Sequence, residues 1–381
     1  MAWHNKVKNR ITNIFSFLLF CIVPIVYISA CGGPEPPILL GFVGGLSGRV
    51  ADLGISGRNG AIMAVENINS AGGVHNRKVK LVVMDDKQDG GTAEQVVKDL
   101  IDKEVLAIIG HMTSSMSMQT VPIVNAREVI MVSPTTTTTF LSKKDDYFYR
   151  VSNTTKSYAT IMARYLFDTL TIRNVAVVYD LRNSAYTESW LGDFRKEFEK
   201  SGGRIAAAVT FHSGPDAHLF DTAKQAMLPG VEALVISAGA MDTAMLCQQV
   251  RKMGKDITIA AAEWAATEKL LELGGAAVEG VIVSQFFDRN STDPVYVKFR
   301  QDYKKRFGNE PGFASVNSYD AVNVVLSALK KQKSGKLLKK SIEQVSEYKG
   351  VQGVVKIDQY GDADRKTFLS VVRKGEFVAA E

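Results

Sequence analysis

The chain has 381 residues, 46% of them hydrophobic and 23% charged, and a formal net charge of +6. This composition is that of a folded globular protein, and it excludes a wholly disordered, a collagenous or a many-spanning membrane chain. The length predicts two domains or one long α/β domain, and three cysteines are too few for a disulfide scaffold. The body has no basic stripe interleaved with aromatic residues, so we expect no nucleic-acid partner.

The N-terminal segment has the layout of an export signal. Residues 1–10 are polar and basic, a long and almost uncharged apolar run follows, and Cys31 then begins a stretch rich in glycine and proline. The tripeptide before the cysteine, Ile28-Ser29-Ala30, resembles the lipobox of bacterial lipoproteins, in which the cysteine is acylated after cleavage.

We therefore predict a signal peptide over 1–30, lipidation at Cys31 and a linker over 31–37. The alternative is an uncleaved membrane anchor, because the apolar run is long enough to span a bilayer. Both interpretations place the body in the cell envelope, tethered to a membrane outside the cytoplasm.

The first part of the body alternates short buried runs with segments of helical periodicity, which predicts a parallel sheet covered by helices. The predicted strands are 38–43, 78–86, 106–111 and 129–134, and the predicted helices are 57–73, 92–103 and 115–128.

A second series of the same kind begins near residue 156. Its predicted strands are 174–180, 204–211, 232–237 and 258–262, and its predicted helices are 158–170, 188–202, 219–228 and 242–254. Two such series predict two similar doubly wound lobes. A strand near 280–287, two helices over 293–308 and 315–331, and two short terminal segments follow.

In open parallel sheets, ligands bind beyond the carboxyl ends of the strands, at the N-termini of the following helices. The turns there contain no G-x-G-x-x-G, no G-x-x-x-x-G-K-S/T and no H-E-x-x-H pattern, and no spacing of His, Cys, Asp and Glu predicts a metal site. We therefore expect no cofactor and no metal. Without a paired acid and base or a nucleophile elbow, we also expect no enzymatic activity.

Hydroxyl side chains follow two strands of the first series. Ser114 lies in the turn after 106–111, and residues 135–139, all threonine, follow the strand at 129–134. Such hydroxyls taken singly are often helix caps. Two clusters on neighbouring strands, with no basic side chain close in sequence, predict a neutral cradle for a small carboxylate.

The second series places a carboxylate and aromatic rings at the same kind of strand end. Glu263 and Trp264 follow the strand at 258–262, while Tyr186 and Trp190 follow the strand at 174–180. The carboxylate suits a ligand cation and the rings suit an apolar ligand group. Alternatively, Glu263 is a surface residue and Trp190 packs its own helix.

Several segments together resemble the type I periplasmic binding proteins, and more narrowly the leucine/isoleucine/valine-binding family of ABC importers. The resemblance runs from about residue 38 to the C-terminus. It rests on GFVGGLSGRVADLG, on GAIMAVENINSAGGVHNRKVKLVVMDD with its Asn69-Ser70-Ala71-Gly72-Gly73 piece and Asp85-Asp86 pair, and on IIGHMTSSMS and VSPTTT.

The resemblance implies a Venus-flytrap fold, in which two doubly wound parallel-sheet lobes are joined by three crossover segments and close on a ligand. Lobe 1 would comprise 38–155 and 286–355, and lobe 2 would comprise 156–285 and 356–381. The implied function is an extracytoplasmic, lipid-anchored substrate-binding protein that captures a branched-chain or related amino acid for ABC permease subunits and is a monomer. The alternative is a ligand sensor, or a receptor for a carboxylate or amide that is not an amino acid.

The resemblance also assigns roles to individual residues. Ser114 and Thr137 would hold the ligand carboxylate through hydroxyl and backbone N–H groups. The carbonyl of Thr135, the hydroxyl of Thr137 and the carboxylate of Glu263 would receive the ammonium group, and Tyr186 would contact the ligand from lobe 2.

The sequence departs from the family in the side-chain pocket. Leu53 stands where family members can present a tyrosine, and the turn at 237–240 lacks the expected aromatic residue. Trp264 and Trp190 are candidates to fill that volume. A cysteine pair that bridges some members is absent, so we expect no structural disulfide.

Overall fold

The computed structural model describes residues 35–332 and 337–380, and the chain divides into two units, Met1–Pro37 and Ile38–Glu381. Of the first unit only residues 35–37 are described, and they form neither helix nor strand. The predicted signal peptide and the predicted lipidation at Cys31 lie outside the described residues and stay predictions. The second unit, the body, carries all of the architecture below.

The first sheet of the body has five parallel strands in the order β2-β1-β3-β4-β5. The central strands are short and almost entirely apolar, as expected when both faces of a parallel sheet are covered. The strands are β1 (Ile38–Gly44), β2 (Val79–Asp85), β3 (Ala107–Ile109), β4 (Ile130–Ser133) and β5 (Phe148–Arg150).

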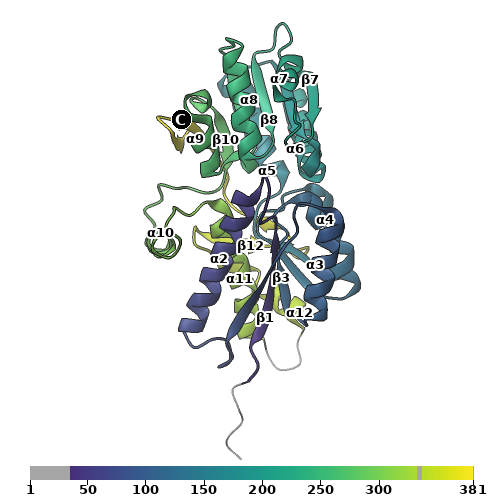
Figure 1. Cartoon of the computed structure of the whole chain (residues 1–381), viewed down its shortest axis with the longest axis vertical. Coiled ribbons are helices and arrows are strands. Elements are labelled where there is room, and N and C mark those ends of the chain that lie inside the picture. The colour runs from purple at the N-terminus through teal and green to yellow at the C-terminus, as the bar shows by residue number, and fades with distance from the viewer. Residues whose placement is uncertain (1–34, 333–336, 381) are drawn as a thin grey trace, which may run out of the picture. The chain divides into compact units, whose positions relative to one another are not determined.

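Helices cover both faces of this sheet (Figure 1). On one face α2 (Ala51–Ser70) packs beside α11 (Phe313–Lys331), so closely that a Cβ atom at Gly60 would lie 2.0 Å from the carbonyl oxygen of Ser315. The other face is covered by α3 (Gly90–Asp102) and α4 (Ser114–Ala126). We call the sheet with these helices lobe 1.

The second sheet has seven strands in the order β7-β6-β8-β9-β10-β14-β15. The first five are parallel and repeat the strand order of lobe 1, whereas β14 and β15 extend the sheet in antiparallel fashion. The strands are β6 (Asn174–Asp180), β7 (Arg204–Phe211), β8 (Ala233–Ser237), β9 (Thr258–Ala261), β10 (Ile282–Gln285), β14 (Phe368–Arg373) and β15 (Glu376–Ala379).

The helices of this second sheet also lie on both of its faces. One face packs against α5 and α6, and the other against α7, α8 and α9. We call this assembly lobe 2, and its helices are α5 (Thr155–Arg164), α6 (Ser184–Lys200), α7 (Leu219–Ala226), α8 (Ala240–Lys252) and α9 (Glu268–Gly274). The prediction of two similar doubly wound lobes is confirmed.

Over its described residues, the body passes between the two sheets three times. The first two passages follow β5 and β10, and the segment after β10 continues into α10 (Pro294–Phe307) and α11. After α12 (Leu338–Val345), a small antiparallel sheet is formed by β11 (Glu347–Lys349), β12 (Val354–Ile357) and β13 (Ala363–Asp364).

The position of the small sheet indicates where the chain returns from lobe 1 to lobe 2. The expected boundary at residue 356 falls inside β12, and the carbonyl of Gly361 still accepts a hydrogen bond of 2.9 Å from the backbone N–H of Arg150 in lobe 1. The next strand of the seven-stranded sheet begins only at Phe368. We therefore place the third crossover at 365–367, after the small sheet.

Candidate functional site

A cavity lies where the strand-end turns of the two lobes face one another. It encloses about 470 Å³ of space not filled by protein atoms, its opening to solvent included. The structure brings all seven residues predicted from the sequence to its wall: Leu53, Ser114, Thr135, Thr137, Tyr186, Glu263 and Trp264. That these residues bind a ligand stays a prediction.

The N-terminus of α4 forms one end of the cavity. The helix begins at Ser114, and the first N–H groups of a helix have no partner within it. The Oγ of Ser114 accepts hydrogen bonds of 3.4 Å from the backbone N–H groups of Thr137 and Thr138, in the turn after β4. This end of the cavity offers N–H groups and the positive end of a helix dipole, which suit a small carboxylate.

The threonine turn, residues 135–139, is tied to the loop before α4 by side-chain hydrogen bonds. Ser133 Oγ donates to the carbonyl of His111 at 2.7 Å, and Thr135 Oγ1 donates to the carbonyl of Met112 at 2.6 Å. These hydroxyls, at the end of β4 and directly after it, therefore fix the two turns against each other.

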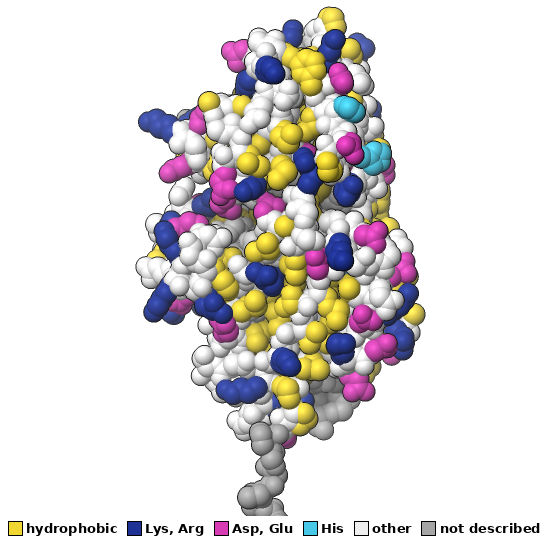
Figure 2. All heavy atoms as spheres, in the orientation of Figure 1, with side chains coloured by type: hydrophobic (Ala, Val, Ile, Leu, Met, Phe, Trp, Pro, Cys, Tyr) yellow, Lys and Arg dark blue, Asp and Glu magenta, His cyan; other side chains and the backbone are white. Residues whose placement is uncertain are grey.

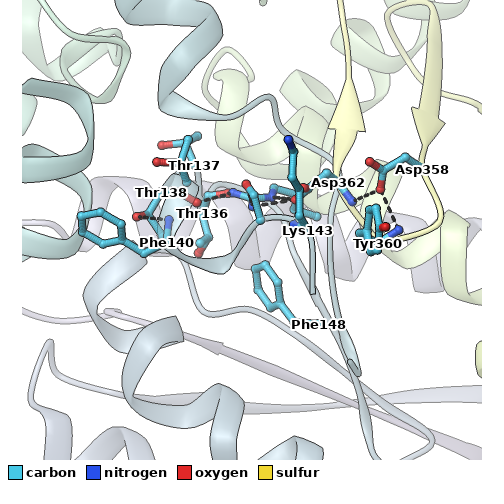
Figure 3. A network of polar contacts seen from close by, with 12 residues as sticks. Thr136, Thr137, Thr138, Phe140, Lys143, Phe148, Asp358, Tyr360 and Asp362 are labelled. Carbon is cyan, nitrogen blue, oxygen red and sulfur yellow. Dashed lines mark hydrogen bonds and ion pairs between the residues drawn. The ribbon is translucent and has the colours of Figure 1, made fainter. Parts of the chain in front are cut away.

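An ion pair between Arg150 and Asp362 also supports the threonine turn, and Figure 3 shows Asp362 near Lys143 and the turn. The guanidinium of Arg150, at the end of β5, is fully buried and donates to the carbonyl of Thr138 at 2.8 Å and to Asp362 Oδ1 at 2.8 Å. Burial lowers the pKa of Arg150, and the charge of Asp362 opposes that shift. Our sequence reasoning missed both residues, because Asp362 lies 212 residues away along the chain.

The carboxylate of Glu263 forms the other polar end of the cavity. It follows β9 in a short helical turn, and its side chain is buried. Thr137 Oγ1 donates to Oε1 at 3.3 Å, and Trp190 Nε1 donates to Oε2 at 3.1 Å. Burial raises the pKa of Glu263 to about 8, although hydrogen bonds from Tyr186, Thr137 and Trp190 favour the charged form and oppose the rise.

Two aromatic rings of lobe 2 form the adjoining wall. Tyr186 and Trp264 meet edge to face, with ring centroids 5.6 Å apart and planes at 82°. The pKa of Tyr186 is raised well above its usual value by burial and by the nearby charge of Glu263, so the hydroxyl keeps its proton. This wall is apolar apart from the hydroxyl of Tyr186 and the indole N–H of Trp264.

From the sequence, Trp190 is a candidate to fill the side-chain pocket, but the structure gives it a different role. Its side chain is fully buried on α6, stacks on Phe194 with centroids 5.2 Å apart, and is not part of the cavity wall. Its indole N–H reaches Glu263 from behind. Trp190 therefore holds the carboxylate, and Trp264 borders the space.

The compartment away from the two polar ends is lined mainly by apolar groups. Besides Leu53, it contains residues that the sequence analysis did not single out: Met112, Tyr158, Ala266, Phe286 and Phe313. They come from both lobes and from the segment after β10, so no local pattern marks them as neighbours.

Polar contacts join the two lobes around the cavity. Arg49 of lobe 1 forms an ion pair with Asp242 of lobe 2, and Thr267 Oγ1 donates to Asp52 Oδ2 at 2.8 Å. Beside the N-terminus of α4, the backbone N–H of Ser115 donates to Asn183 Oδ1 at 3.0 Å. These contacts hold the two lobes close together around the cavity.

Other features considered in the sequence take structural roles. Asp85 Oδ1 accepts hydrogen bonds from the backbone N–H groups of Leu46 and Lys87, and therefore holds two turns.

Within residues 35–332 and 337–380, no group of three or more potential metal ligands occurs, and none of the helices has the length and apolar character of a membrane span. Acidic and basic side chains are intermixed on the face in Figure 2, without a field of one sign.

Comparison with known proteins gives consistent results. A family model described as periplasmic binding protein matches residues 37–376. The leucine-, isoleucine-, valine-, threonine- and alanine-binding protein of Pseudomonas aeruginosa is 22% identical over 316 residues, which cover 82% of this chain and 83% of that protein.

Solved structures resemble the body closely. A leucine-binding protein from Thermotoga maritima superposes with a TM-score of 0.83 at 26% identity, over 90% of this chain and 98% of that one. A solute-binding protein of an ABC transporter from Rhodopseudomonas palustris, in complex with 3,4-dihydroxybenzoic acid, gives a TM-score of 0.79 at 22% identity, over 90% and 95% of the two chains.

Proposed function

Because the chain belongs to the periplasmic binding proteins, we propose that it captures an α-amino acid between its lobes and delivers it to the membrane subunits of an ABC importer. The observation that supports this proposal most is that one cavity combines partners for both charges of a zwitterion, the N–H groups beside Ser114 and the carboxylate of Glu263. Thr137 takes part in both ends. A zwitterion matches this pair of ends by charge-assisted hydrogen bonds.

The apolar walls of the cavity favour a branched-chain or related side chain. Leu53, Phe286 and Phe313 offer no charge to a ligand, and relatives named for leucine, isoleucine and valine binding share the fold. Because a ligand in the cavity touches both lobes, it stabilises the closed state, and the permease recognises that state. We propose binding without chemical conversion.

Ligand-dependent thermal unfolding tests the proposal. A ligand that binds only the native protein raises the melting temperature by mass action. We expect L-leucine, L-isoleucine or L-valine to stabilise the protein, and their 2-keto acid analogues to stabilise it much less, because they lack the ammonium group that faces Glu263. Equal stabilisation by both classes would contradict the role of Glu263.

Variants of the carboxylate end complete this test. Ser114→Ala combined with Thr137→Ala removes hydroxyls from the polar ends and is expected to weaken amino-acid binding. Ser70→Ala removes a hydroxyl from the exposed end of α2 and serves as the control. Unchanged affinity in the double variant would remove the proposed carboxylate site.

A carboxylate without an amino group is the second candidate ligand. The pKa of Glu263, about 8, favours this alternative, because a carboxyl group that is protonated at neutral pH needs no ligand cation. The two ligand classes have opposite pH dependences. Amino-acid affinity should rise from about pH 6 to pH 8 as Glu263 loses its proton, whereas the affinity for a simple carboxylate should fall over the same range. Isothermal titration calorimetry at both pH values separates them.

We further propose that Cys31 is acylated and anchors the protein to a membrane outside the cytoplasm, and that the body is a monomer. Metabolic labelling with a palmitate analogue should mark the wild-type protein and not Cys31→Ala.

Whether ligand binding serves transport or signalling is tested by uptake of labelled ligand in cells with and without the gene. Normal uptake in its absence would favour a sensor.

A further inference from the structure

The segment that leaves β10 separates the cavity from a second, larger depression. Gln285 and Phe286 line the cavity and also line a groove on the other side of this segment. The groove is open to solvent. With the openings to solvent included, the groove encloses about 2050 Å³ and the cavity about 470 Å³. Two side chains are therefore shared by both spaces.

Both side chains are held from the groove side. The guanidinium of Arg365 lies over the ring of Phe286, 4.6 Å from its centroid. Arg365 is itself fixed by an ion pair of 3.1 Å with Asp320 and a hydrogen bond of 2.8 Å to Asn317 Oδ1. The oxygen of Gln285 accepts a hydrogen bond of 2.9 Å from Arg289 Nη1, and its nitrogen donates to Ser370.

We propose that Phe286 is a partition that sets the greatest length of ligand side chain the cavity accepts. The inference rests on the proposed function, because it takes the ligand to be held by its carboxylate at the N-terminus of α4. With that end fixed, the ligand's side chain extends into the apolar compartment, where the ring of Phe286, 9% exposed, separates it from the groove. The wild-type protein therefore selects short side chains. Removal of the ring joins the two spaces and admits long ones.

Phe313 provides a matched control. It is also an aromatic wall of the cavity, but it does not border the groove. Phe313→Ala therefore enlarges the cavity by one side chain without joining it to the groove. Phe286→Ala removes the same group from the shared wall. Only Phe286→Ala joins the cavity to the groove.

The experiment measures dissociation constants for L-leucine, L-phenylalanine and 4-phenyl-L-phenylalanine with the wild-type protein and both alanine variants. We expect Phe313→Ala to improve phenylalanine relative to leucine. Only Phe286→Ala should also improve 4-phenyl-L-phenylalanine relative to leucine, by about tenfold or more, a discrimination that apolar pockets typically reach. Phe286→Leu, which keeps an apolar side chain, should give an intermediate ratio and covers the case in which the alanine variant does not fold.

Equal ratios for 4-phenyl-L-phenylalanine in the Phe286 and Phe313 variants would overturn the partition. If the wild-type protein binds no amino acid, the proposed ligand is wrong, and the same comparison is made with benzoate and biphenyl-4-carboxylate, which lack the ammonium group. A preference for the longer acid that appears only in the Phe286 variants still supports the partition, and its absence there contradicts it.

Discussion

The indole nitrogen of Trp190 donates a hydrogen bond of 3.1 Å to Glu263 Oε2, across 73 residues of sequence. The donor approaches the carboxylate from the interior of lobe 2, where Trp190 is fully buried between α6 and the sheet. The hydrogen bond favours the charged form and so opposes burial, which raises the pKa of this carboxyl group to about 8. We therefore expect Trp190 to act on the proposed ligand site through Glu263, without bordering the cavity.

Replacement of Trp190 tests this relationship. Trp190→Phe keeps the ring that stacks on Phe194 and removes the donor. We expect the pKa of Glu263 to rise further and amino-acid affinity at neutral pH to fall by about 1.5–3 kcal/mol, the contribution of a hydrogen bond to a charged group. Calorimetry over a pH series is the measurement. An affinity profile identical to that of the wild type would show that the indole N–H does not act on Glu263.

The ligand-free protein should lose stability as Glu263 ionises. The pKa of Glu263 is about 8 in the folded chain, against an ordinary value of 4.5, so the folded state holds this proton more tightly than the unfolded state. The free energy of unfolding therefore falls between about pH 4.5 and pH 8 and changes no further from this group above that range.

Glu263→Gln removes this contribution. We expect its melting temperature to depend less on pH than that of the wild type between about pH 5 and pH 8, with the larger advantage of the variant at the upper end. Its amino-acid affinity should fall even so, because the ammonium partner is gone. Parallel melting curves would mean that the carboxylate is hydrated in the ligand-free protein.

The ion pair behind the threonine turn should contribute both to stability and to binding. Arg150→Met removes the ion-pair partner of Asp362, whose carboxylate still accepts a hydrogen bond from the backbone N–H of Lys143, and leaves the carbonyl of Thr138 without its donor. We therefore expect a loss of about 3 kcal/mol in the free energy of unfolding. Urea denaturation measures it. The control is Arg127→Met, which removes an exposed ion pair with Asp102 and should cost less than about 1 kcal/mol.

The contact between Arg49 and Asp242 should slow opening of the closed state. It joins the lobes, and its side chains are 25% and 5% exposed. We expect Asp242→Asn to weaken ligand binding by about 1 kcal/mol, mainly through faster dissociation. Stopped-flow measurement of ligand release tests this. If the variant changes the association rate alone, the pair acts on ligand encounter and not on the closed state.

The type of fold was predictable from the sequence because strands and helices each have a pattern that is visible within a short stretch of residues. Alternating runs such as 38–43 and 57–73 have periodicities that belong to a strand and a helix, and two series of them imply two sheets. The passage near residue 356 was placed too early, because β12 and β13 pair with β11 instead of joining the large sheet. Short strands of this kind carry no signal of which partner they choose.

The sequence by itself determined the parallel lobes and the polar side chains at their strand ends, since a strand that leads into a helix turn places Ser114, Thr137 and Glu263 at one edge of its sheet whatever the rest of the chain does. Only the tertiary structure decided what surrounds them. The partners Trp190 and Asp362 and the shared wall at Phe286 depend on how distant elements pack and on where the crossovers run. Side-chain contacts over such separations follow from three-dimensional packing, and no spacing along the chain encodes them.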